Sequence, residues 1–109
     1  KLTITYTLPK PKEKLPARTQ ALWQTFIDGI DRHEKVHGEL IRTLVRNIEA
    51  ATVGMTVDGD PKCVKIKDEL KQRLTTIFQA HQQANRDFDK AEMSAGGNIQ
   101  RLILELVNG

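Results

Sequence analysis

Apolar residues along the chain follow two different periods. Residues 2–8 alternate apolar side chains with threonine, and a period of two is typical of a strand with one buried face. Across residues 17–53 the apolar positions instead recur every three or four residues, which predicts one long amphipathic helix. The same spacing predicts a second long helix over 61–93 and a short third helix over 98–107. Between strand and first helix, residues 9–16 contain three prolines and are expected to form a stiff connector.

Turn signals separate the two long helices. Gly54 is suited to end the first helix, and Asp58 and Gly59 are typical turn residues. Asp60 is a good N-cap and Pro61 suits the first helical position, so the second helix is expected to begin there. A short turn between long helices predicts an antiparallel hairpin.

The predicted strand has no partner within the sequence. A lone strand leaves backbone groups unpaired on both edges and is not independently stable. We therefore expect an α+β, mainly α fold, in which residues 1–109 form one domain with two long antiparallel helices, a short C-terminal helix and an N-terminal strand. The rest of the sheet is expected to lie outside this sequence or in a partner chain.

The charge distribution argues against nucleic-acid binding. The net charge is +3, of which the segment 1–18 carries +4 and the remainder −1, because this segment holds five basic side chains and one acidic side chain. The excess thus lies in a lysine- and proline-containing segment, whereas a nucleic-acid binder is expected to carry it on a folded face with aromatic residues. No apolar run approaches the roughly 20 residues of a membrane span, and no intact signal peptide is recognisable.

The first long helix contains a motif typical of zinc enzymes. Residues 33–37 read His-Glu-Lys-Val-His, and two histidines four residues apart lie on one helix face, about 6 Å apart along the axis. His33 and His37 are therefore predicted to bind one Zn²⁺, which would lower the pKa of a bound water to about 7. Glu34 stands next to them and is the predicted catalytic base. The alternative is a pair of core histidines satisfied by ordinary hydrogen bonds.

A third ligand is needed, and His81 is the first candidate. The number of residues from His33 to Val53, the predicted end of the first helix, equals the number from Pro61, the predicted start of the second, to His81. A tight hairpin turn would therefore place the two histidines at the same level along the helix axes. The alternative is that His81 is a core histidine or one that supports a ligand. Glu92 and Asp89 are the next candidates, as carboxylate ligands.

The chain resembles a bacterial family in the order and spacing of several features. These are the strand, the Leu8-Pro9 step, Trp23, the motif helix, a cysteine opening the next helix and the Phe88-Asp89 pair. This is the family of predicted secreted zinc-dependent proteases, first catalogued as a domain of unknown function, and the resemblance covers about residues 2–97. It implies a zincin-like fold, a secreted or periplasmic location, His33 and His37 as ligands and Glu34 as the base. It also implies a disulfide from Cys63 to a cysteine ahead of the strand.

One departure from the family pattern concerns the end of the second long helix. Relatives carry a Thr-x-His-Gly element after the aromatic-Asp pair, and here Glu92 and Ser94 occupy the threonine and histidine places. Either His81 or Glu92 substitutes for that histidine, or activity is weaker.

The leading hypothesis from sequence is a zinc metallopeptidase acting on a peptide or protein substrate. One alternative is a non-catalytic helical structural or interaction module that retains the motif. Another is a zinc hydrolase of a non-peptide amide, which shares the chemistry and differs in its pocket.

Overall fold

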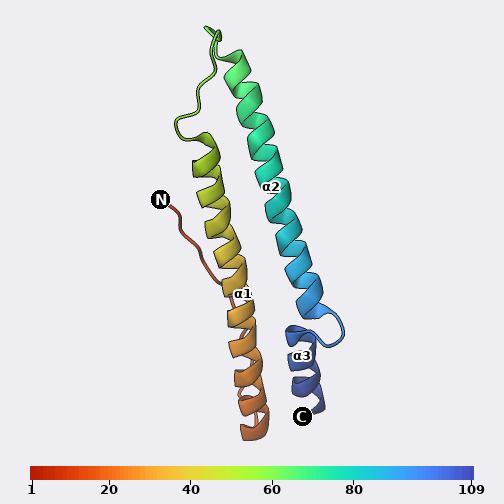
Figure 1. Cartoon of the computed structure of the whole chain (residues 1–109). Coiled ribbons are helices and arrows are strands. Elements are labelled where there is room, and N and C mark those ends of the chain that lie inside the picture. Colours follow the sequence, from red (N-terminus) through yellow and green to blue (C-terminus); the bar gives the residue numbers. More distant parts are fainter. The chain divides into compact units, whose positions relative to one another are not determined.

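The computed structural model describes residues 1–109 and contains three helices (Figure 1). These are α1 (Ala17–Thr52), α2 (Val64–Met93) and α3 (Asn98–Asn108), against predicted ranges of 17–53, 61–93 and 98–107. Contacts divide the chain into two units. Unit 1 comprises residues 1–38 and 87–109, and unit 2 comprises residues 39–86, so that α1 and α2 each contribute to both.

The α+β fold predicted from the sequence is wrong, because the structure is helical and contains neither a strand nor a sheet. Residues 2–8 have no second strand with which to pair, and an unpaired strand is not stable by itself. The segment instead contacts α1, where the hydroxyl of Tyr6 lies directly over Gly38. Ile4 and Leu8 are half-buried, whereas Leu2, Tyr6 and the threonines are exposed, so only part of the predicted apolar face is covered.

Unit 2 is a pair of helical segments that run antiparallel, residues 39–52 of α1 and 64–86 of α2 (Figure 1). The guanidinium of Arg73 donates to the carbonyl of Ala51 at 2.6 Å, which fixes their register. Arg73 lies more than two turns into α2, whereas Ala51 is next to the last residue of α1. At a rise of about 1.5 Å per residue, roughly 14 Å of α2 therefore lies beyond the end of α1.

Asp60 organises the start of α2, which begins three residues later than predicted. The Asp60 carboxylate accepts hydrogen bonds from the backbone N–H groups of Lys65 and Ile66 at 3.0 and 2.8 Å. Partial desolvation by itself would raise the pKa of Asp60, but the backbone donors of Ile66, Lys65 and Val64 outweigh it and lower the pKa. The preceding Cys63 is an exposed free thiol with a positive φ of 58°.

Unit 1 contains the few fully buried apolar side chains of the molecule, Ile99 and Leu102 of α3. Leu102 packs against Gly29 in the middle of α1, where an added Cβ would lie 2.1 Å from its Cδ1. A glycine within a helix costs about 1 kcal/mol relative to alanine, and here its small size permits the close approach of α3. The turn from α2 into α3 uses Gly96, whose φ of 83° favours glycine.

No helix in the structure is both long enough and apolar enough to span a membrane.

Candidate metal centre

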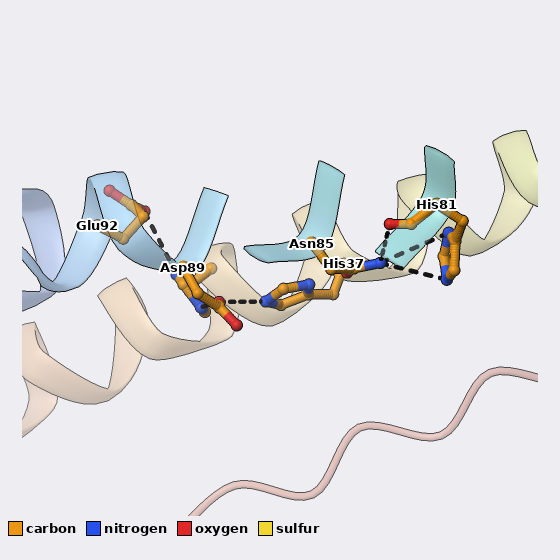
Figure 2. A network of polar contacts seen from close by, with 6 residues as sticks. His37, His81, Asn85, Asp89 and Glu92 are labelled. Atoms are coloured by element: carbon orange, nitrogen blue, oxygen red, sulfur yellow. Dashed lines mark hydrogen bonds and ion pairs between the residues drawn. The ribbon is translucent and has the colours of Figure 1, made fainter. Parts of the chain in front are cut away.

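Two helices of unit 1 bring together three side chains that could hold a metal ion. His33 and His37 come from successive turns of α1, and Asp89 comes from the last turns of α2. One ligand atom from each lies within 4.8 Å of the others. Oδ1 of Asp89 is 3.0 Å from Nε2 of His33 and 2.7 Å from Nε2 of His37, the second of which Figure 2 shows.

The distances can be compared with those around a small tetrahedral cation. Zinc bonds of about 2.0–2.1 Å to nitrogen and oxygen place neighbouring ligand atoms of a tetrahedron about 3.3 Å apart. The two nitrogen–oxygen distances, 3.0 and 2.7 Å, are shorter than this, so the cluster would have to open for a cation to enter. Two imidazoles and one carboxylate are also a ligand set found in catalytic zinc sites.

His33 lies between two carboxylates, an arrangement that either a doubly protonated ring or a bound cation would satisfy. Besides Asp89 at Nε2, the ring has Oε1 of Glu92 at 3.4 Å from Nδ1. A neutral imidazole carries only one N–H, while a carboxylate only accepts, so one of the two contacts would oppose lone pairs. With a cation held by Nε2 and Asp89, the single proton of His33 stays on Nδ1 and is donated to Glu92. The donor set therefore fits a bound metal.

The burial of these groups decreases from His33 toward Asp89. The side chain of His33 is 3% exposed and that of Glu92 13%, whereas His37 is 20% and Asp89 51% exposed. His33 is thus fixed within unit 1, while the Asp89 side faces solvent and can admit water or a ligand.

Phe88 holds both imidazoles in place. Its ring stacks on His33 with centroids 4.6 Å apart and meets His37 edge-on at 5.3 Å. The two imidazoles themselves meet edge to face at 5.0 Å. Such aromatic contacts restrict ring rotation and so pre-orient the nitrogens toward Asp89.

Glu34, the predicted base, lies on α1 between the two histidines in sequence and is half-buried. It is not one of the three residues whose ligand atoms converge, so its carboxylate is separate from the cluster. Its role as the catalytic base therefore stays a prediction.

His81 is not part of the cluster. His81 belongs to unit 2, where the Nδ2 atom of Asn85 lies 3.2 Å from Nε2 of His81 (Figure 2). The same Nδ2 donates to the backbone carbonyl of His81 at 2.9 Å. The height count that points to His81 assumes a tight turn between helices that end level, whereas the Arg73–Ala51 contact shows that the first turns of α2 extend beyond the end of α1. Asp89, two turns further along α2, is the residue that lies opposite His33.

The two other candidates near the end of α2 have distinct surroundings. Glu92 contacts His33 from the side away from Asp89, as an acceptor rather than a member of the three-residue cluster. Ser94, directly after α2, donates its hydroxyl to the carbonyl of Lys90 and does not join the site. The sequence favours His81 over Asp89 as the third ligand, and its one signal toward Asp89 is the Phe88-Asp89 pair, both members of which contact His33 in the structure.

Comparison with known families gives one match. The family described as "Bacterial protein of unknown function (DUF922)" matches residues 1–97, which include α1, α2 and every residue of the cluster. No curated protein and no solved structure matches the chain.

Proposed function

We propose that this chain, which belongs to the bacterial family of unknown function DUF922, is a zinc-dependent metallopeptidase. The proposed ligands are His33, His37 and Asp89, and the proposed general base is Glu34. The observation that carries the proposal is the convergence of two imidazole nitrogens of a His-Glu-x-x-His helix on one carboxylate oxygen of α2.

Zinc, when bound, would supply a polarising positive charge that lowers the pKa of a coordinated water and draws electron density from a substrate carbonyl. Three protein ligands leave a coordination position open, which is the arrangement of catalytic rather than structural zinc sites. The half-exposed carboxylate of Asp89 puts that open side toward solvent.

The chain's own residues divide the remaining work. Glu34 accepts the proton of the attacking water and later delivers a proton to the leaving amine. Glu92 accepts from Nδ1 of His33 and so keeps the lone pair on Nε2, the nitrogen that faces Asp89. Phe88 excludes water from one face of His33 and fixes the ring plane.

The variant Glu34→Gln tests the catalytic assignment. It preserves size and removes the proton acceptor, so zinc should remain bound at one equivalent while peptide hydrolysis falls by about 10²–10⁴-fold, the usual contribution of general base catalysis. Hydrolysis of a quenched fluorescent peptide library and zinc content by mass spectrometry are the two measurements, with the exposed Glu39→Gln on the same helix as the control. Retained hydrolysis in Glu34→Gln would refute the assigned role.

A non-catalytic structural metal site is the second candidate, and one observation favours it. Unit 1 has only two fully buried apolar side chains, so a cation linking α1 to α2 would add substantially to its stability. This alternative predicts that chelation lowers the melting temperature while no peptide is cleaved by the zinc-loaded protein. The metallopeptidase also loses stability on chelation, so cleavage is the result that separates the two.

A further inference from the structure

A pocket of about 350 Å³ lies in unit 1 next to the metal centre. It is lined by residues of all three helices, among them Arg32, Phe88, Glu92, Asn98, Arg101 and Leu102. Its volume is at the lower end of the range of about 300–1,000 Å³ typical of ligand sites, so it suits one side chain or a chain end rather than a long peptide.

Two walls of the pocket are also walls of the metal centre. Phe88 lines the pocket and stacks on His33 at 4.6 Å. Glu92 lines it and contacts Nδ1 of the same histidine at 3.4 Å. A group bound in the pocket is therefore separated from His33 by the side chains of Phe88 and Glu92.

The charge of the pocket favours an anion. Arg32 and Arg101 contribute two guanidinium groups, and Asn98 adds an amide that can donate. Arg101 also pairs with Glu105 at 3.0 Å, but such exposed pairs one helical turn apart are weak, and the guanidinium has five donors. The one acidic side chain is Glu92, one oxygen of which lies 3.4 Å from the ring of His33, so two guanidinium groups stand against one carboxylate and the lining keeps a net positive charge.

Resting on the metallopeptidase function, we propose that this pocket binds a carboxylate of the substrate, held by Arg32 and Arg101. Planar guanidinium groups match carboxylates with paired hydrogen bonds, and they remain charged at every physiological pH. The carboxylate has two possible sources with the same chemistry, an acidic side chain or the C-terminus of the peptide.

Binding of matched peptides to the zinc-loaded full chain carrying Glu34→Gln tests the pocket without requiring turnover. Three probes are used: an alanine tetrapeptide blocked at both ends, the same peptide with a free C-terminal carboxylate, and the blocked peptide with glutamate at each position in turn. Amide chemical-shift titration gives each dissociation constant. At least one carboxylate probe should bind about tenfold or more tightly than the neutral peptide, as expected for charge-assisted hydrogen bonds.

The double variant Arg32→Gln, Arg101→Gln should remove this preference and leave binding of the neutral peptide unchanged. Arg42→Gln, an exposed arginine of α1 outside the pocket, should behave as the parent. Whichever probe gains affinity identifies the source of the carboxylate. Equal binding of all probes, or a preference that survives the double variant, would overturn the proposal.

Hydrolysis by the chain with native Glu34 keeps the two proposals apart. If it cleaves the carboxylate probe, the double variant should raise KM for that probe and leave cleavage of the neutral peptide unaffected. A carboxylate preference in binding without any cleavage would leave the pocket assignment standing and count against the metallopeptidase function alone.

Discussion

Replacement of Glu92 tests whether this residue positions a metal ligand or binds the metal itself. In the structure Oε1 of Glu92 lies 3.4 Å from Nδ1 of His33, and its side chain is 13% exposed. Residues that orient a metal-bound histidine contribute about 10–100-fold to metal affinity. Because this separation is longer than the usual hydrogen-bond distance of about 2.7–3.2 Å, we expect the lower end of that range.

The variant Glu92→Leu should therefore weaken zinc binding about tenfold, which corresponds to about 1.4 kcal/mol. Glu92→Gln keeps a neutral acceptor of about half the strength, so zinc affinity should fall only about threefold. Asp89→Ala removes a proposed ligand, so zinc affinity should fall by more than about 100-fold, which exceeds the contribution of an orienting residue.

Competition against a fluorescent zinc chelator measures these constants, with Glu69→Leu as the control. Glu69 is an exposed glutamate of the same helix, paired with Arg73 in unit 2, and its loss should not change zinc affinity. Unchanged affinity in Glu92→Leu would refute the positioning role. A loss as large as that of Asp89→Ala would show that Glu92 is itself a ligand.

Two further predictions concern stability. Leu102→Ala should lower the free energy of unfolding, measured by urea titration, by about 2–5 kcal/mol, because it removes a buried contact with Gly29. The control Leu104→Ala, at an exposed position, should lower it by less than about 0.5 kcal/mol. Similar losses in both variants would contradict the packing of α3. The lowered pKa of Asp60 stabilises the fold above its unfolded value near 3.8, and this contribution is lost as pH falls through the lower folded pKa. Thermal melts should therefore show the native chain losing its advantage over Asp60→Asn between about pH 5 and pH 2, while Asp58→Asn tracks the native chain; a constant difference across that range would rule out the capping role.

The helices were predictable from sequence because their signals are local. The period of three to four residues, the absence of proline from 17–53 and the turn residues 58–60 act within a few positions. Observed helix ends accordingly lie within three residues of those predicted. The largest difference is at the start of α2, where Asp60 caps from four residues upstream of Val64 and residues 61–63 form turns instead of the first helical turn.

The strand and the third ligand depend on contacts between distant residues. The alternation over 2–8 marks the side that carries the half-buried Ile4 and Leu8, but it does not show that the segment contacts α1 instead of a sheet. Likewise, the motif placed His33 and His37 on one face, whereas the partner across from them depends on how far α2 extends past α1. The offset between the end of α1 and the start of α2 depends on the path of residues 53–63. Local sequence rules do not specify how far such a connection extends along the helix axis.

Anomalous diffraction at the zinc edge, on crystals grown with one equivalent of zinc, would show whether His33, His37 and Asp89 hold the metal. We expect a single peak bonded to Nε2 of His33, Nε2 of His37 and a carboxylate oxygen of Asp89, at about 2.0–2.2 Å from each. A structure without a zinc peak, in which both imidazoles bond Asp89 directly, would contradict this assignment.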